Sequence, residues 1–200
     1  MRKSLQDIHN YWNNPDKYNK PELYVKKEAN AKSAFLYNNI KQYITKQTTI
    51  LDIGCNSGRN LNYLYNLGYK NLTGIEINKE AVLLMQKTYP KLFLNSKIIN
   101  LPVEIAIKGI ADNKHDLIFT MATLEHIHPD SAWVFTEMIR ICNGYIVTIE
   151  DEETNSPRHF PRNYYRIFGG QMEQIAKLKA SDYVNLPRGF VLRVFKKVKK

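Results

Sequence analysis

One short stretch of this chain combines residue types that can hold a polar or anionic ligand. Residues 50–60 read Ile-Leu-Asp-Ile-Gly-Cys-Asn-Ser-Gly-Arg-Asn, an apolar strand followed by a glycine-bearing turn and a helix start. Such a turn lets the backbone approach a ligand closely and points free helix N–H groups at its anionic part. A dinucleotide fingerprint anchored on Gly54 requires glycines where Asn56 and Arg59 stand, so the spacing disfavours that cofactor class. The simpler reading is a tight turn made by Gly54 and capped by Asp52.

A second chemically useful residue, Glu76, ends the strand predicted over 72–77. An acid at such a strand end, about 20 residues after a glycine loop, can accept hydrogen bonds from both hydroxyls of a ribose. A carboxylate suits this task because it offers two acceptor oxygens to two adjacent donors. The alternative is an acid near the N-cap of the helix that starts at Lys79, a role that Asn78 fills better.

A third polar group, Glu125-His126-Ile127-His128, follows the strand predicted over 115–120. His126 and His128 are the predicted catalytic bases, because a neutral imidazole accepts a proton near pH 7. Alternatively, Glu125 and His126 hold the loop and His128 begins a helix. No metal site is predicted, since these two histidines alone are too few ligands.

Taken together, the three motifs resemble those of class I S-adenosylmethionine (SAM)-dependent methyltransferases of the small-molecule type. The first family motif is acid-x-Gly-x-Gly-x-Gly, with Asn56 here replacing the middle glycine, and residues 115–129 resemble the fourth-strand motif. The resemblance covers about residues 48–150 and implies SAM as cofactor and S-adenosylhomocysteine as product. Asn56 is acceptable because SAM has no pyrophosphate, and its amide can donate to the methionyl carboxylate. The implied cofactor contacts are Asp52, Gly54, Cys55, Asn56, Gly58, Asn60, Glu76, Ile77, Ile98, Thr120 and Met121.

One departure from the family concerns the adenine of the cofactor. Lys97 stands where many relatives have an acid that contacts the adenine amine. We therefore expect backbone and apolar groups near Ile98 and Ile99 to hold the ring, with no single adenine anchor.

The methyl acceptor is indicated only by residues after the fifth predicted strand. A narrower likeness, to methylases associated with bacterial surface sugars, rests on residues 54–60 and 158–164. Arginine forks suit phosphate and carboxylate groups, so a small anionic metabolite such as an activated or phosphorylated sugar is favoured. The predicted substrate-binding residues are Glu125, Glu150, Arg158, His159, Arg162 and Tyr164. The alternatives are a solvated acidic loop over 150–153 and surface helix charges for the arginines.

The elements that must position these residues alternate between strands and helices. Strands are predicted over 49–53, 72–77, 97–99, 115–120, 144–149, 172–178 and 190–198, and helices over 59–67, 79–88, 129–141 and 161–168. Apolar strands that alternate with helices indicate a parallel sheet covered on both faces. The last two strands lack an intervening helix and predict an antiparallel edge hairpin. We therefore expect an α/β fold, a Rossmann-like doubly wound sheet.

The predicted organisation is one domain, residues 1–200. Residues 1–45 form an N-terminal helical cap with breaks at Pro15 and Pro21, the second helix running from Pro21 through Ala29 to Ile40. Residues 46–200 form the SAM-binding core with C-terminal substrate-side elements. The aromatic residues Tyr11, Trp12, Tyr18 and Tyr24 are interpreted either as a lid over the site or as packing against the sheet.

Composition narrows the remaining function classes. The chain has 200 residues, 44% of them hydrophobic and 24% charged, which is ordinary for a globular protein, and no apolar run reaches the ~18 residues of a membrane span. Cys55 and Cys142 fit neither a disulfide framework nor a zinc site, so a reducing cytoplasm is expected. Most of the net charge of +10 lies in residues 158–200. Because of that basic segment, a nucleic-acid methyltransferase remains an alternative function. The substitution at Asn56 leaves a non-catalytic SAM-binding protein as a second alternative. The sequence does not indicate the oligomeric state.

Overall fold

In the part of the chain that the structure describes, the central sheet has seven strands. The computed structural model describes residues 2–25 and 30–198. The strands are β1 (Ile50–Ile53), β2 (Leu72–Ile75), β3 (Lys97–Ile99), β4 (His115–Met121), β5 (Cys142–Asp151), β6 (Met172–Lys179) and β7 (Phe190–Lys197). Their order is β3-β2-β1-β4-β5-β7-β6, parallel from β3 to β5, with β7 antiparallel to both β5 and β6. The predicted doubly wound sheet with an antiparallel edge hairpin is confirmed.

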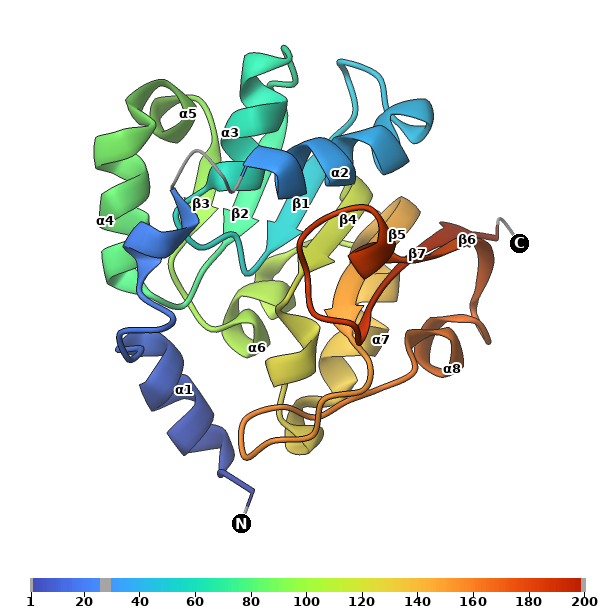
Figure 1. Cartoon of the computed structure of the whole chain (residues 1–200). Helices are drawn as coiled ribbons and strands as arrows, with labels where there is room; N and C mark the ends of the chain where they lie inside the picture. The colour runs from blue at the N-terminus through green and yellow to red at the C-terminus, as the bar shows by residue number, and fades with distance from the viewer. Residues whose placement is uncertain (1, 26–29, 199–200) are drawn as a thin grey trace.

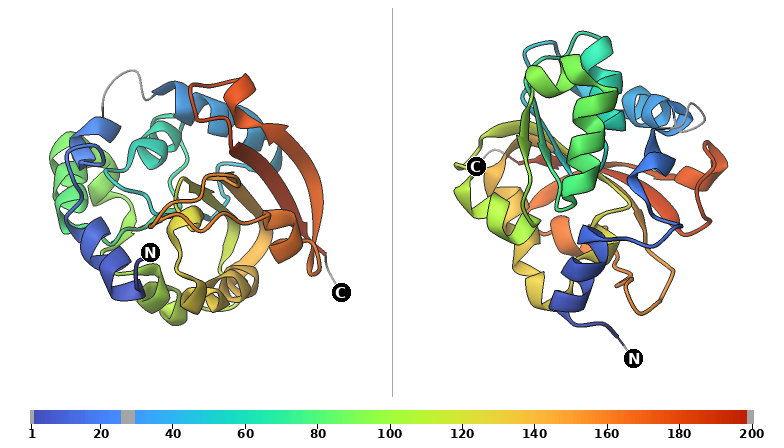
Figure 2. Two further views of the ribbon diagram at one scale, coloured as in Figure 1. Left: turned by 60° about the horizontal axis from the view of Figure 1, so that its bottom comes forward. Right: turned by 90° about the vertical axis from the view of Figure 1, so that its left-hand side faces the viewer.

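Helices cover both faces of this sheet (Figures 1 and 2). The α-helices are α1 (Leu5–Asn13), α2 (Asn30–Ile40), α3 (Arg59–Asn66), α4 (Lys79–Thr88), α5 (Pro90–Leu94), α6 (Val103–Ala106), α7 (Trp133–Ile141) and α8 (Tyr164–Phe168). The 3-10 turns are η1 (Pro21–Tyr24), η3 (Lys41–Tyr43), η4 (Ile107–Gly109), η5 (Leu124–His126), η6 (Pro129–Ser131) and η7 (Ala180–Asp182). Side chains of α2, α3, α4 and α5 fill one apolar core, and those of α6, α7 and α8 fill the other. None of the helices in the described part of the chain has the length and apolarity needed to cross a membrane.

Alternation along the strands divides the sheet between these two cores. Leu51 and Ile53 of β1 face the α6–α7 side, whereas Ile50 faces α2 and α3. All three side chains are fully buried. Each such side chain contributes about 1.5–3 kcal/mol relative to an exposed one, which holds the strand in register. Both faces are therefore apolar, as the near-continuous hydrophobic strands predict.

Several elements differ from the sequence predictions. β5 runs on through Asp151 because β7 pairs with it up to that residue, so Glu150 lies inside the strand rather than after it. The helix predicted from Pro129 divides into η6 and α7, and the short helices α5 and α6 were not predicted. Pro21 begins the 3-10 turn η1; Ala29, predicted to continue a helix from it, lies outside the described residues.

The carboxyl ends of the parallel strands meet at one edge of the sheet. Helix α1 and the segment after β5 lie beyond that edge (Figure 1). They are joined there, because the Lys3 backbone N–H donates to the Pro157 carbonyl oxygen at 3.0 Å. In an open α/β sheet this edge is where ligands bind.

Candidate functional site

The loop after β1 has three residues in the left-handed backbone region. Gly54 and Gly58 both have φ of +79°, and Asn56 has φ of +47°. Asparagine is among the few non-glycine residues that adopt this conformation readily, which explains why it can replace the middle glycine of the motif. A side chain at position 54 would collide with Thr123, and one at position 58 would lie 2.7 Å from Met85. The two glycines are therefore required by close packing as well as by φ.

Glu76 lies directly against this loop. Its Oε2 accepts the backbone N–H of Asn56 at 2.8 Å, and its Oε1 accepts that of Asn78 at 2.7 Å. Burial raises the pKa of Glu76, and the backbone donors from Asn78 and Asn56 oppose that rise. Each oxygen keeps a second lone pair for a ligand. Asn78 in turn caps α4 by accepting the N–H groups of Glu80 and Ala81, as predicted.

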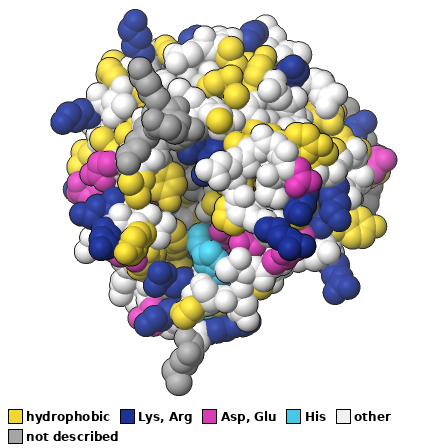
Figure 3. Space-filling model, viewed as in Figure 1, with side chains coloured by type: hydrophobic (Ala, Val, Ile, Leu, Met, Phe, Trp, Pro, Cys, Tyr) yellow, Lys and Arg dark blue, Asp and Glu magenta, His cyan; other side chains and the backbone are white. Residues whose placement is uncertain are grey.

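A cavity of about 480 Å³ opens beside Glu76 at the carboxyl edge of the sheet. That volume is within the usual range for small-ligand sites, about 300–1,000 Å³. Its walls come from the β1 loop, the ends of β2 and β4, helix α1, and the segment after β5. Figure 3 shows a hollow on this face, with histidine and acidic side chains gathered beside it.

Two cations line the cavity near the loop. The guanidinium of Arg59 lies with Nη2 3.3 Å from the Met121 sulfur, and burial lowers its pKa. Burial also lowers the pKa of the Lys32 amine, and the Arg59 charge adds to that effect. Within the described residues neither cation forms an ion pair at 4.0 Å or less. This end of the cavity therefore favours an anionic group.

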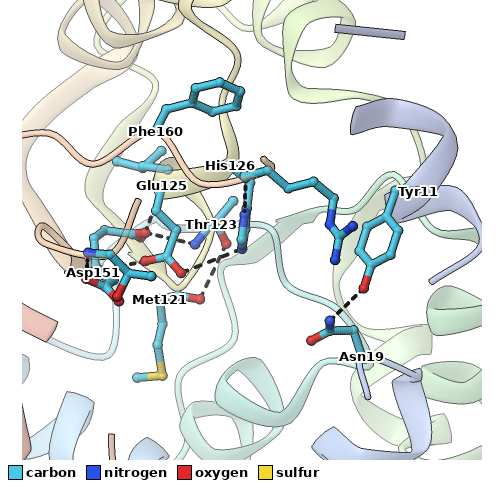
Figure 4. A network of polar contacts seen from close by, with 12 residues as sticks. Tyr11, Asn19, Met121, Thr123, Glu125, His126, Asp151 and Phe160 are labelled. Atoms are coloured by element: carbon cyan, nitrogen blue, oxygen red, sulfur yellow. Dashed lines mark hydrogen bonds and ion pairs between the residues drawn. The ribbon is translucent and has the colours of Figure 1, made fainter. Parts of the chain in front are cut away.

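The opposite end of the cavity holds a cluster of polar side chains from η5 and from residues 156–160. His126 lies between the Trp12 ring, 4.4 Å away between centroids, and the His159 ring, 4.5 Å away. Its Nδ1 is 3.0 Å from the Arg158 carbonyl oxygen, and its Nε2 is 3.6 Å from Oε1 of Glu125 (Figure 4). Burial lowers the pKa of His126 to about 3, so the imidazole is neutral at pH 7.

Glu125, a member of this cluster, and the neighbouring Glu150 are both buried acids. Glu150 accepts the backbone N–H groups of Thr123 and Glu125 through Oε2, and Glu125 accepts the Asp151 N–H. Burial raises the pKa of both Glu125 and Glu150, and their mutual repulsion raises that of Glu125 further. The pair therefore resists carrying two negative charges at once.

Comparisons with known proteins give a family match for the central part of the chain and several solved structures of similar fold. Residues 51–147 match the family model described as a methyltransferase domain. The fold is similar to PH0226 of Pyrococcus horikoshii OT3 (TM-score 0.71, 13% identity, 88% of this chain and 99% of that one). It is also similar to geranyl diphosphate C-methyltransferase of Streptomyces coelicolor A3(2) (TM-score 0.73, 12% identity, 96% of this chain and 97% of that one). A third similar structure is magnesium protoporphyrin IX methyltransferase of Synechocystis PCC 6803 (TM-score 0.72, 10% identity, 98% of this chain and 100% of that one). The latter two were crystallised with S-adenosylhomocysteine. A search of curated proteins finds no match.

Residues 51–147 form a SAM-dependent methyltransferase domain. Its cofactor is SAM, and the structure offers an independent test of fit. The Glu76 carboxylate, held by two backbone N–H groups, faces a cavity that also contains Arg59 and Lys32, neither of which has an ion-pair partner among the described residues. SAM presents a ribose diol and a carboxylate, the groups that these residues can bind.

Seven of the predicted cofactor contacts of the methyltransferase line the cavity: Gly54, Cys55, Asn56, Asn60, Glu76, Ile77 and Met121. Four do not: Asp52, Gly58, Ile98 and Thr120. Asp52 and Thr120 are buried in the sheet at 1% and 0% exposure, Gly58 packs on Met85, and Ile98 packs into the core on the α2–α3 side. Sequence reasoning missed Ser57, Arg59 and Lys32; the first two stood inside the quoted motif, whereas nothing in the sequence pointed to Lys32.

The predicted substrate residues of the methyltransferase divide in the same way. Glu125, Arg158 and His159 line the cavity. Glu150, Arg162 and Tyr164 do not, because each is used to hold the fold. Arg162 donates to the carbonyl oxygens of Leu124, Phe160 and Ile127 at 2.6–3.1 Å. Tyr164 is fully buried in the core beside Phe135 and Phe168.

The two predicted catalytic histidines also differ in position. His126 lines the cavity, whereas His128 does not. The His128 Nδ1 accepts the Asp130 N–H and starts η6, and its ring packs on Phe160. The structure thus supports the helix-start reading for His128. Of the predicted aromatic lid, Tyr11, Trp12 and Tyr24 line the cavity, while Tyr18 is 73% exposed and does not.

Proposed function

We propose that the methyltransferase transfers a methyl group from SAM to a small anionic metabolite, with an activated or phosphorylated sugar favoured. The observation that carries this proposal is the position of Arg158. Its guanidinium stacks 3.7 Å from the centroid of the Tyr11 ring, lines the cavity, and makes no ion pair with a described carboxylate. A cation held in this way is positioned to bind a phosphate or carboxylate group of the acceptor.

The cofactor end of the cavity is assigned on the same reasoning. Bound SAM supplies a methyl group already activated on a sulfonium. Glu76 accepts the ribose hydroxyls through its remaining lone pairs, while Arg59 and Lys32 neutralise the methionyl carboxylate. Ile77 and Leu101 line the cavity next to Glu76 and offer apolar contact to the adenine. Ile98 has no place in this assignment because it lies outside the cavity.

The acceptor end supplies positioning, water exclusion and a proton acceptor. Because the His126 Nδ1 faces a carbonyl oxygen, it must carry the proton, which leaves the lone pair on Nε2, the ring nitrogen 3.6 Å from Oε1 of Glu125. His126 is therefore the group that we propose to take the proton of an acceptor hydroxyl or ammonium. Trp12 covers the ring and keeps water from it. Alignment of the acceptor with the S–CH₃ bond accounts for most of the remaining rate enhancement.

The structural neighbours support a small acceptor. Geranyl diphosphate methyltransferase, magnesium protoporphyrin IX methyltransferase and the 1,6-didemethyltoxoflavin-N1-methyltransferase of Burkholderia thailandensis are each named for a small-molecule acceptor. The composition of the basic C-terminal segment favours a nucleic-acid substrate, but the structure uses several of its cations to hold the fold. Arg193 is 4% exposed and pairs with Glu152 at 2.7 Å, and Lys197 donates to the carbonyl oxygens of Ile139 and Cys142. Lys199 and Lys200 lie outside the described residues.

We also propose a reducing, cytoplasmic location, since Cys55 and Cys142 are buried free thiols.

Two measurements test the proposed function. Calorimetric titration with S-adenosylhomocysteine should show saturable binding; its absence at high micromolar concentration would overturn the assignment. Incubation with methyl-labelled SAM and a cell extract, divided by size into metabolites and RNA, should place the label in the metabolite fraction. Label in the RNA fraction, with gel shifts that weaken steeply with salt, would favour the nucleic-acid alternative. Binding without any transfer would favour a non-catalytic SAM-binding protein.

A further inference from the structure

Three side chains at the acceptor end of the cavity bring potential metal ligands together. Glu125, His126 and His159 each offer one ligand atom, and these atoms lie within 4.8 Å of one another. Glu125 and His126 come from η5, and His159 from the segment after β5, where a bridge between Ser156 and His159 folds the chain back. Nothing in the sequence spacing linked His159 to the other two, which is why the sequence predicted no metal site.

Each of the three groups has an unused lone pair. His126 donates from Nδ1 to the Arg158 carbonyl oxygen, so Nε2 carries the lone pair. The distance of 3.6 Å from Nε2 to Oε1 of Glu125 is too long for a hydrogen bond. Oε2 of Glu125 is occupied by the Asp151 N–H, and Nδ1 of His159 is buried without a hydrogen-bond partner among the described residues. Buried polar groups that lack partners require an explanation, and a cation among them supplies one.

The surroundings resemble the outer shell of a metal site. Histidine ligands usually donate their second N–H to a carbonyl or carboxylate, and ligating carboxylates are themselves hydrogen-bonded. The Arg158 carbonyl and the Asp151 N–H fill these two roles. The Trp12 ring covers one side of the site. Figure 4 shows the Glu125 carboxylate and the His126 ring directed toward one another, with Asp151 beside them.

We propose that Glu125, His126 and His159 bind one divalent transition-metal ion, which presents an open position to the methyl acceptor. Two imidazole nitrogens and one carboxylate oxygen suit Zn²⁺, Co²⁺ or Fe²⁺ and disfavour Mg²⁺ and Ca²⁺. At bond lengths of about 2.1 Å, tetrahedral ligand atoms are about 3.4 Å apart, so binding draws the three side chains closer together.

The location of the acceptor in this proposal rests on the proposed function. An acceptor hydroxyl bound at the open position loses its proton to solvent because the cation stabilises the alkoxide. The oxygen lone pair then forms the new bond to the methyl carbon, and the carbon–sulfur bond breaks with its electron pair remaining on sulfur. His126 cannot serve as both ligand and base, since Nε2 has one lone pair. Metal binding therefore replaces the base role proposed above.

Cobalt binding tests this site without knowledge of the acceptor. Chelator-stripped protein is titrated with Co²⁺, and visible absorption reports the coordination while calorimetry with S-adenosylhomocysteine reports the cofactor site. We expect one Co²⁺ per chain with tetrahedral or five-coordinate bands, displaced by Zn²⁺. His159→Asn and Glu125→Gln should weaken Co²⁺ binding at least tenfold, whereas His128→Asn, outside the cavity, should leave it unchanged.

The outcomes separate this proposal from the methyltransferase assignment. If S-adenosylhomocysteine binds but Co²⁺ does not bind stoichiometrically, the metal site is refuted and the His126 base stands. Binding of Co²⁺ that is equally strong in His159→Asn also refutes the site. If S-adenosylhomocysteine fails to bind the intact wild-type protein, the proposed function itself fails, whatever the cobalt result.

Discussion

The Arg158 guanidinium lies 3.7 Å from the centroid of the Tyr11 ring, so a residue after β5 is held by a residue of α1. Arg162, four positions later, points instead into three backbone carbonyl oxygens. Two arginines of one segment thus have different roles. One remains available in the cavity, whereas the other ties η5 to the segment that follows Phe160.

Separate substitutions of these two arginines should have different effects, one on acceptor binding and the other on the free energy of unfolding. Arg158→Gln should raise the KM for an anionic acceptor at least tenfold while changing the free energy of unfolding by less than about 0.5 kcal/mol. Arg162→Gln should lower the free energy of unfolding by about 2–3 kcal/mol, because it removes charge-assisted hydrogen bonds to partly buried carbonyls. Steady-state kinetics and urea unfolding measure the two effects. An unchanged KM in Arg158→Gln would remove the anion from the proposed acceptor.

Glu76→Gln should weaken S-adenosylhomocysteine binding by tenfold or more. The amide replaces one acceptor oxygen by a donor, which then opposes the N–H of Asn56 or Asn78 and loses a ribose contact. Glu80→Gln, an exposed residue of the first turn of α4, is the matched control and should bind normally. Calorimetry compares the three proteins. Equal affinities for the wild type and Glu76→Gln would show that the ribose lies elsewhere.

The left-handed backbone of Asn56 predicts an order of stability. Asn56→Gly should keep the free energy of unfolding within a few tenths of a kcal/mol, since glycine adopts φ of +47° at no steric cost. Asn56→Ala should lose about 1 kcal/mol, because an alanine Cβ is strained in that region. Urea unfolding of the three proteins gives the comparison. Equal stability of the alanine and glycine variants would contradict the strain argument.

The two histidines that follow β4 should respond differently to the same substitution. His126→Asn should reduce kcat by about a hundredfold or more, because it removes the Nε2 lone pair that either accepts the proton of the methyl acceptor or binds the proposed metal ion. His128→Asn should keep kcat within a few-fold, because asparagine also caps a turn and His128 lies outside the cavity. The rate of methyl transfer at saturating SAM measures both. A larger loss in His128→Asn would reverse the assignment.

Buried His115 predicts a loss of stability in mild acid. Burial lowers its pKa from 6.5 to about 4, so between these values the unfolded chain binds a proton that the folded protein does not. Stability therefore falls as the pH decreases through that window, by about 1–2 kcal/mol between pH 7 and pH 5 from this residue. His115→Gln should show a correspondingly smaller decrease in urea unfolding at the two pH values. Parallel decreases in both proteins would exclude His115 as the cause.

Local patterns were sufficient for the cofactor half of the molecule. The helix over 79–88 and the strand over 97–99 were predicted with their observed bounds, because capping by Asn78 and the break at Tyr89-Pro90 act within a few residues. The short helices α5 and α6 escaped prediction, since four or five residues carry too little periodicity. The extension of β5 through Glu150 and Asp151 depends on pairing with β7, about forty residues later, which no local pattern contains.

The sequence by itself determined the mostly parallel sheet, its antiparallel edge hairpin and the proximity of Glu76 to the glycine loop, because the carboxyl ends of parallel strands meet at one edge. Only the tertiary structure decided which polar residues remain available. Arg158 and Arg162 have the same chemistry and differ in whether carbonyl oxygens lie within reach. His126 gained His159 rather than His128 as its neighbour because the segment after β5 folds back over η5. Long-range packing determines such contacts, and the spacing of residues along the sequence does not predict them.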